Sequence, residues 1–246
     1  MAQFSNTTAL TGKNGIIQKI ELTTGLGDGG ISGNAILLSQ VTGIVNDWLG
    51  KMTGDLLQAD GRYEWDDTNY TDQPIATFNL VADQTGYSFT EDDNASQILD
   101  VTRVEVKNAA SGDWIKLRPI DQREISQGYT EWKESSGIPQ YFDFIGTVLT
   151  LFPASSYAST NGCKVWFKRE PSYFAYNDTT KEPGFCTPFQ EMLWLGPSLD
   201  LGIQDKAKAL WAEKRLIDAR ANLIEFYSRR GKYEQPRIVG QVRSSR

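Results

Sequence analysis

The first candidate for chemistry in this sequence is a glycine-rich hexapeptide, Gly25-Leu26-Gly27-Asp28-Gly29-Gly30, which satisfies the pattern G-x-G-x-x-G. In dinucleotide-binding proteins this pattern joins a buried strand to a helix, and its backbone N–H groups hold a pyrophosphate. Here the preceding segment, Ile16 to Leu22, is only a weak extended candidate, and the residues that follow predict strands without the intervening helices of a parallel sheet. We therefore interpret the hexapeptide as a glycine loop that ends at Ser32 or Asn34, either of which can cap the next helix.

Acidic side chains supply the other candidates. Asp67, Asn69 and Thr71 alternate as calcium ligands do, but an EF-hand loop needs glycine sixth and glutamate twelfth, where this chain has Asp72 and Phe78. We interpret the segment from 65 to 74 as a rigid turn rich in Asp and Asn. Paired acids could serve a glycosidase without histidine, and the pairs are Asp66 with Asp67, Glu91 to Asp93, and Asp121 with Glu124. Acids in polar loops are normally solvated, so we interpret these side chains as solvated surface residues and not as a glycosidase site.

The composition argues against catalysis. The chain has no histidine, which removes the commonest general base and metal ligand. It contains no Walker A sequence, HExxH motif or nucleophile elbow. Cys163 and Cys186 match neither a zinc nor a thioredoxin spacing, so we expect two buried thiols in a reducing compartment, with a disulfide as the less favoured alternative. We expect no enzymatic activity, no cofactor and no required metal.

Two helical stretches flank a region of short strands. The first runs from Asn34 to Ala59 and ends before Asp60-Gly61. Its apolar stripe is Leu37, Val41, Ile44, Trp48, Met52 and Leu56. The second begins at Thr187-Pro188-Phe189-Gln190, a capping box with proline at the first helical position, and is broken or kinked at Gly196-Pro197. A final helix, 204–230, is expected to bury Leu210, Ile217, Leu223, Ile224 and Tyr227.

Between the helices, short strand candidates and turn signals favour an antiparallel sandwich or small barrel. The candidates are Ile75–Val81, Tyr87–Thr90, Ile98–Val106, Trp114–Arg118, Gln140–Phe144, Thr147–Phe152 and Cys163–Arg169. In the last of these, Cys163, Val165 and Phe167 alternate with Lys164, Trp166 and Lys168, as expected for one buried and one solvated face. A hairpin loop is predicted at 108–113 and a tight turn at Gly146. The loop after Pro171 carries Tyr173, Phe174, Tyr176 and Phe185, which we expect to pack against the helices.

The sequence thus predicts an α+β fold: a helical bundle or platform with an inserted antiparallel β domain and extended N- and C-terminal arms. The expected segments are an N-terminal arm (1–33), a platform helix (34–59), the inserted β domain (60–171), an aromatic loop with C-terminal helices (172–228) and a basic C-terminal tail (229–246). Residues 1–10 lack the basic start and apolar run of a Sec signal, and no apolar run is long enough for a membrane span.

The net charge of −6 is unevenly distributed. From Asp205 to Arg246 there are eleven Lys or Arg residues and five Asp or Glu residues, a balance of +6, so the preceding residues carry −12. An acidic body repels nucleic acid, whereas a basic end attracts acidic partners. The alternative is that the basic end is a charged helix exposed to solvent, which binds no acidic partner.

Several short segments resemble tailed-bacteriophage neck proteins, specifically the head-to-tail connector, or adaptor, that binds beneath the portal. The segments are Ala59-Asp60 to Trp65, 67–74, Ile120-Asp121-Gln122, Gly137 to Tyr141, Leu151 to Pro153 and Pro183 to Phe185. The resemblance runs from about residue 35 to 228, and its motifs are structural turns, not a catalytic signature.

The resemblance implies a virion protein whose copies form a dodecameric ring that extends the DNA channel. The implied partners are the portal protein ring, tail or stopper and nozzle proteins, and other copies of the same chain. Viral DNA would only pass through the lumen, and no membrane would be involved. In the family the C-terminal segment reaches the portal, which makes the following residues candidates for portal docking: Arg229, Arg230, Lys232, Arg237, Ile238, Val239, Arg243 and Arg246.

Two other classes of function remain open at this point. One is a β-sandwich carbohydrate-binding module, for which the aromatic loop after Pro171 would supply rings. The other is a soluble glycosidase-like or nucleotide-binding enzyme, for which the acidic pairs or the glycine hexapeptide would supply the site. Glycan capture would favour the first, and nucleotide bound to the purified protein would favour the second.

Overall fold

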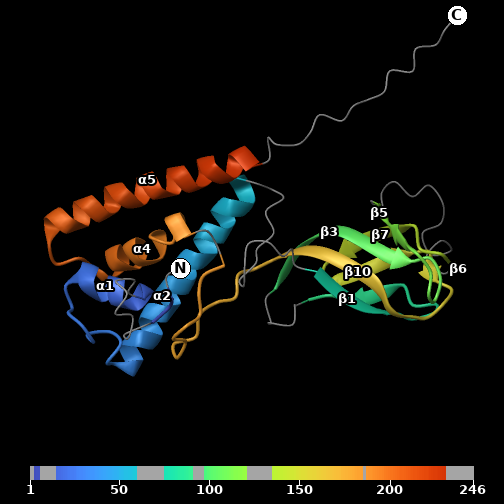
Figure 1. The fold of residues 1–246 in the computed structure, drawn as a ribbon, viewed down its shortest axis with the longest axis horizontal. Helices are drawn as coiled ribbons and strands as arrows, with labels where there is room; N and C mark the ends of the chain where they lie inside the picture. Colours follow the sequence, from blue (N-terminus) through green and yellow to red (C-terminus); the bar gives the residue numbers. More distant parts are fainter. Residues whose placement is uncertain are drawn as a thin grey trace, which may run out of the picture.

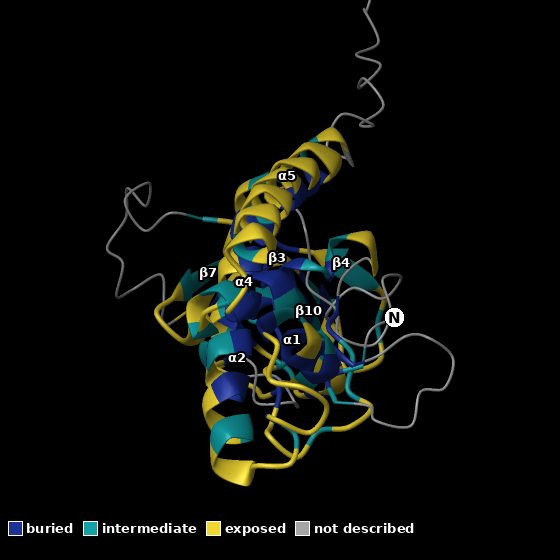
Figure 2. Cartoon of the chain, turned by 90° about the vertical axis from the view of Figure 1, so that its left-hand side faces the viewer, coloured by how far each residue is buried: buried dark blue, intermediate teal, exposed yellow. Residues whose placement is uncertain are grey.

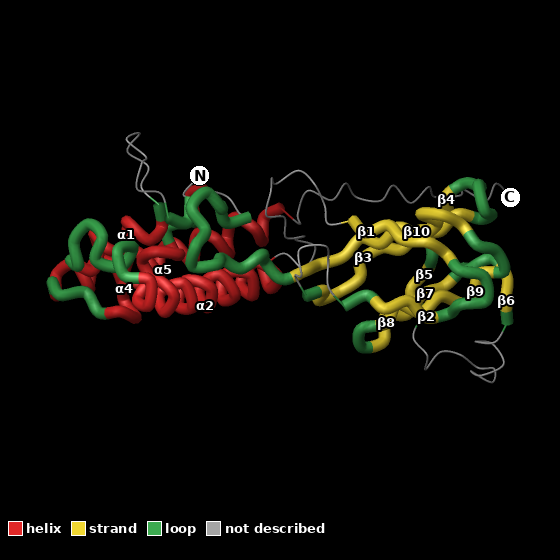
Figure 3. Tube along the Cα trace, turned by 90° about the horizontal axis from the view of Figure 1, so that it is seen from below, coloured by secondary structure: helices red, strands yellow, loops and turns green. Residues whose placement is uncertain are grey.

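The computed structural model describes residues 3–5, 15–59, 75–90, 97–120, 135–184 and 187–230. The protein has an α+β fold, as predicted, with helices gathered at one end and strands at the other (Figures 1 and 3). The strands lie between the second and the later helices in the sequence. We call these two regions the helical part and the β part.

The helical part is organised around one short buried helix. It consists of α1 (Ile16–Thr24), α2 (Ala35–Ala59), the 3₁₀ turn η2 (Thr187–Phe189), α4 (Met192–Leu201) and α5 (Lys206–Arg230). Helix α4 contacts α1, α2 and α5, and its Met192, Leu193 and Leu195 are at most 1% exposed. A helix that is apolar on all sides is stable only when it is surrounded, and α4 occupies that position (Figure 1).

The β part contains two four-stranded sheets and a small pair. The first sheet has the order β1 (Ile75–Leu80), β10 (Ser159–Arg169), β3 (Ile98–Lys107), β4 (Trp114–Lys116). The second has the order β2 (Gly86–Ser88), β8 (Val148–Phe152), β7 (Tyr141–Ile145), β5 (Arg118–Pro119). The pair is β6 (Ser136–Gly137) with β9 (Ala154–Ser155). Pairing is antiparallel except between β5 and β7 and between β6 and β9, which are parallel.

The expected strands and turns are found with small shifts. Alternation in β10 is confirmed, because Cys163, Val165 and Phe167 are buried between the sheets. The predicted hairpin joins β3 to β4 and is closed by the Asn108 N–H, which donates to the Asp113 carbonyl at 2.9 Å. Gly146 turns between β7 and β8 with a φ of 63°, which glycine adopts without steric cost. The segment expected as one strand at 114–118 is divided into β4 and β5, which belong to different sheets.

The two parts have separate hydrophobic cores. The helical core includes Ile20, Val45, Leu193 and Tyr227, whereas the core of the β part includes Leu151 and other residues from both sheets. No residue is shared between the two clusters. Each part therefore buries its own apolar surface.

The N-terminal prediction was wrong over the described residues. Residues 16–24 form α1, neither a strand nor part of an extended arm, because Ile16, Ile17 and Ile20 are spaced to pack one helical face into the core. Phe4 is fully buried and stacks on Phe174, with 4.6 Å between the ring centroids. Phe174 belongs to the helical core, as expected for the aromatic loop, whereas Tyr173 and Tyr176 are 42% and 53% exposed and Phe185 lies outside the described residues.

The details of the later helices also differ from the prediction. Residues 187–189 form a 3₁₀ turn and α4 begins at Met192, so the α-helix starts later than the predicted cap at Thr187. Glu191, the residue before α4, makes no side-chain capping bond. Pro197 lies inside α4 without ending it. A Cβ at Gly196 would lie 2.3 Å from the Trp48 ring, so this glycine permits α4 to pack closely against α2.

The stripe on α2 is largely as predicted, since Val41, Met52 and Leu56 are fully buried. Asn34 caps the helix: its Oδ1 accepts from the backbone N–H of Ile36 at 3.1 Å and of Leu37 at 3.2 Å.

The prediction for α5 failed in part. Leu223 and Tyr227 are fully buried, but Leu210, Ile217 and Ile224 are 69%, 62% and 39% exposed.

Candidate functional site

The glycine hexapeptide holds a carboxylate of its own chain. Helix α1 precedes it, so the strand of a dinucleotide fingerprint is absent. Glu21, which is only 2% exposed, accepts hydrogen bonds from the backbone N–H groups of Ile31 at 2.8 Å, Ser32 at 2.6 Å and Gly29 at 3.4 Å. A carboxylate held in this way occupies the donors that a phosphate would need. The loop is a structural turn that fixes α1 against the start of α2.

The other candidates for chemistry gain no support from the geometry. Among the described residues no group of three or more His, Cys, Asp or Glu side chains could hold a metal ion. The calcium candidates Asp67, Asn69 and Thr71 and the acids at 66–67, 91–93 and 121–124 lie outside the described residues. No helix in the part of the chain that the structure covers could cross a bilayer.

Cys163 is free and fully buried in the β part. Burial raises the pKa of its thiol well above the ordinary value of 9.0, because a thiolate is poorly solvated there. The thiol therefore remains protonated and is not a nucleophile at neutral pH. Cys186 lies outside the described residues.

The strongest surface feature of the helical part is the outer side of α5. Leu210, Ile217 and Ile224 are exposed and are spaced seven residues apart, so they form one row along the helix, which we call the α5 ridge. At a rise of about 1.5 Å per residue the row is roughly 21 Å long. Most of α5 is exposed along its length (Figure 2). Trp211 and Phe226 add further exposed apolar surface, at 53% and 47%.

Ion pairs on both sides hold α5 in place and orient the ridge. Arg220 donates to both carboxylate oxygens of Asp55 on α2, each at 2.7 Å. The neighbouring carboxylate raises the pKa of the Arg220 guanidinium, mainly through the hydrogen bond. On the other side Arg215 donates to Glu191 at 2.7 Å. The helix that carries the ridge is therefore tied to α2 and to the residue that precedes α4.

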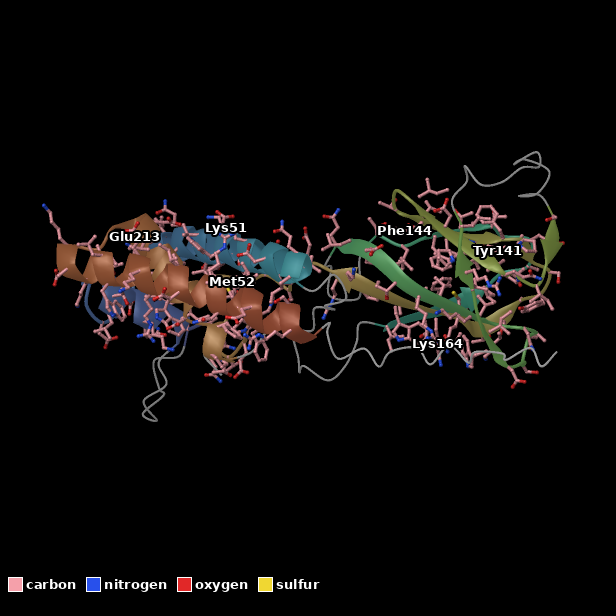
Figure 4. All side chains as sticks on the ribbon, turned by 90° about the horizontal axis from the view of Figure 1, so that it is seen from above. Lys51, Met52, Tyr141, Phe144, Lys164 and Glu213 are labelled. Carbon is pink, nitrogen blue, oxygen red and sulfur yellow. The ribbon has the colours of Figure 1, made fainter. Side chains whose placement is uncertain are left out.

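A second surface of interest is the side of α2 that carries glycines. Gly43, Gly50 and Gly54 lie on one face of the helix, and a Cβ at Gly43 or Gly54 would meet nothing within 4 Å. A groove of about 630 Å³ lies here, lined by Gly43, Asn46, Asp47, Gly50, Lys51 and Tyr173. Figure 4 shows Lys51 on the outer side of α2.

Tyr173 forms one wall of this groove. Burial raises the pKa of its phenol, and the nearby carboxylates of Glu170 and Asp47 raise it further. The lining carries one residue of each charge, Asp47 and Lys51. The backbone beside it is fixed by Asn46, whose amide donates to the Phe174 carbonyl and accepts from the Phe174 N–H, both at 2.9 Å.

The portal-docking candidates are only partly within the described residues. Arg229 lies in the last turn of α5 and pairs with Glu225 one turn earlier, and Arg230 is the last residue of the helix. The other candidates lie outside the described residues: Lys232, Arg237, Ile238, Val239, Arg243 and Arg246. Of the candidates, the described residues therefore place only Arg229 and Arg230, which are neighbours at the end of α5.

Sequence reasoning missed the α5 ridge, although its spacing was visible. Leu210, Ile217 and Ile224 form a strict heptad row, but they were placed with Leu223 and Tyr227 on a single buried side. Successive residues on a helix are about 100° apart, so Leu223 and Ile224 cannot both face the same core. The sequence matches no protein-family model and no curated protein, so the roles of these surfaces rest on their geometry.

Proposed function

We propose that this protein is a structural virion component, a head-to-tail adaptor of a tailed bacteriophage. In this proposal copies of the chain assemble as a dodecameric ring beneath the portal, extend the DNA channel and provide the surface on which tail, stopper or nozzle proteins dock. The protein acts by assembly and carries no enzymatic activity.

The observation that carries the proposal is the exposed α5 ridge. An isolated chain gains nothing from three large aliphatic side chains in a row on the surface, whereas burial of each in an interface contributes about 1.5–3 kcal/mol. A heptad row is the arrangement by which a helix packs along another helix. Helix α5 has 25 residues, which is long enough for such a contact with a neighbouring chain.

The two separate cores also support the proposal. A helical part with its own core can form the body of a ring while the β part projects from it (Figure 1). Helix α5 ends at Arg230, and the remaining sixteen residues have four Lys or Arg residues and one Glu. A basic segment at this end could pair with acidic side chains of a portal ring.

The experiment that tests the proposal is a measurement of particle mass, with and without a purified portal ring. We expect the 27.5 kDa chain to form a closed ring on the portal, with twelve copies per portal. The variant Leu210→Ser/Ile217→Ser should remain folded but fail to assemble. The matched control Lys208→Ser/Asn222→Ser changes two exposed residues of the same helix and should assemble normally. A chain that stays monomeric at all concentrations and does not bind the portal would refute the proposal.

A further inference from the structure

The outward face of the first sheet gathers positive charge and indole rings. Strands β10, β3 and β4 contribute five cations to it: Arg103, Lys107, Lys116, Lys164 and Lys168. Trp114 and Trp166 lie among them, because Trp166 is opposite Arg103 and Trp114 is opposite Lys107 in the strand register. We call this surface the basic sheet face.

These side chains all point away from the core of the β part. On β10 the alternate residues Cys163, Val165 and Phe167 are buried between the sheets, so Lys164, Trp166 and Lys168 project to the other side. Lys164 lies on the far side of the β part from Tyr141 and Phe144 of the second sheet (Figure 4). The face is therefore an outer surface of the molecule.

Two of the cations form ion pairs and three do not, although Glu105 also lies opposite both Lys116 and Lys164 in the strand register. Arg103 pairs with Glu105, and Lys168 pairs with Asp100 at 3.4 Å. No carboxylate pairs with Lys107, Lys116 or Lys164 in the described ranges. The face thus has a surplus of three positive charges on a chain whose net charge is −6. A local surplus of this sign is where a polyanion would bind an otherwise acidic protein.

The indoles fix the positions of the lysines. The ammonium of Lys164 lies 4.2 Å from the centroid of the Trp114 ring, and that of Lys107 lies 5.6 Å from the same ring. The Arg103 guanidinium lies 5.3 Å from the Trp166 ring. A cation held over an indole has lost part of its rotamer freedom before any ligand arrives, which lowers the entropic cost of binding.

We propose that the basic sheet face binds the phosphate backbone of duplex DNA, without reading its sequence. The cations come from three adjacent strands about 4.8 Å apart, so they cover an area that matches several consecutive phosphates and not a single small anion. The indoles are half-buried beneath the cations, so they position the lysines and do not stack on bases. The inference concerns the isolated chain and does not depend on ring assembly.

The test is the fluorescence anisotropy of a labelled 30-base-pair duplex titrated with the full chain at 25 to 200 mM salt. We expect affinity to fall with salt, with a log–log slope of about −3 or steeper. Lys116→Gln/Lys164→Gln should weaken binding at least tenfold at low salt and make the slope shallower by about two. Lys116→Arg/Lys164→Arg keeps both charges and should bind within a few-fold of the unchanged protein.

The matched control is Lys206→Gln/Lys208→Gln, which removes the same charge from exposed positions on α5 and should leave binding and slope unchanged. Circular dichroism of each variant separates lost binding from lost fold. Binding that does not depend on salt, or equal losses in control and test variants, would overturn the inference. Equal affinity for poly-glutamate would also overturn it and would point to an acidic protein partner.

Discussion

Arg220 of α5 donates two hydrogen bonds to the Asp55 carboxylate of α2, one to each oxygen, each 2.7 Å long. The Asp55 side chain is 10% exposed, whereas Arg220 is 59% exposed. The pair spans 165 residues of sequence and fastens the outermost helix of the helical part to the helix that precedes the β part. Together with the Arg215–Glu191 pair and the buried Leu223 and Tyr227, it orients the α5 ridge.

The first prediction concerns this pair. Arg220→Ala should destabilise the protein by about 1.5–3 kcal/mol, because it leaves the buried Asp55 carboxylate without its charged donor. Chemical denaturation followed by circular dichroism measures the change. Arg215→Ala removes the pair with Glu191, whose carboxylate is more exposed than that of Asp55, and should cost no more than about 1 kcal/mol. Equal losses of stability in the two variants would show that the Asp55 carboxylate finds another hydrogen-bond donor when Arg220 is removed.

The second prediction concerns Glu21. Glu21→Gln should lower the free energy of unfolding by about 1.5–3 kcal/mol, because a neutral amide is a weaker acceptor for the N–H groups of Ile31 and Ser32. Thermal melting tests this expectation. Glu225→Gln on exposed helix surface is the control and should change stability by less than about 0.5 kcal/mol. An unchanged melting temperature in Glu21→Gln would contradict the role given to this carboxylate.

The third prediction separates the stability of the chain from its assembly. Gly43→Ala should stabilise α2 by up to about 1 kcal/mol, since the added Cβ meets nothing in the chain and alanine favours a helix. If a neighbouring chain approaches this face closely, the same substitution should weaken assembly. Gly196→Ala is the contrast and should destabilise the fold, because its Cβ would overlap the Trp48 ring. Melting curves and particle mass, measured on the same samples, distinguish the two effects.

The fourth prediction follows from the pKa of Cys163. Burial raises the pKa of this thiol in the folded state above 9.0. The contribution of the protonated thiol to the free energy of unfolding is therefore complete below pH 9 and is lost as the pH rises above 9. Each pH unit in this range should lower the free energy of unfolding by about 1.4 kcal/mol. Cys163→Ala should show a shallower decline between pH 9 and 10.5. Identical slopes would mean that the alkaline loss comes from other groups, such as Tyr87, whose pKa burial also raises.

The fifth prediction addresses the basic C-terminal segment. Truncation after Lys232 should leave the melting temperature unchanged and abolish binding to an isolated portal ring, because it removes Arg237, Arg243 and Arg246, three of the six basic docking candidates. Binding of both forms at low and high salt is the measurement, and the loss should be greatest at low salt. If the truncated form binds the portal as tightly as the full chain, the tail is not the docking segment and the portal contact lies on the helical part.

The separation into helices and strands followed from periodicity, which depends only on local backbone geometry. Val41, Met52 and Leu56 repeat at helical spacing on α2, and the alternation along β10 separates Val165 from Lys164. These patterns are imposed by the backbone itself, so no partner is needed to recognise them. Asn34 and Gly146 were identifiable in the same way, since capping and left-handed turns require particular residue types.

The sequence by itself therefore determined the α+β class and, from α2 onward, the succession of helical and strand regions, but not α1. Only the tertiary structure decided which apolar residues lack a partner and which charges share a face. Ile217 and Leu223 are equally apolar, and only the position of α4 and α2 around α5 buries one and exposes the other. Lys116 and Lys164 are 48 residues apart in the sequence, and only the register of β4, β3 and β10 places them on one face, on either side of Glu105. Such pairings depend on contacts between distant segments, which local residue patterns do not encode.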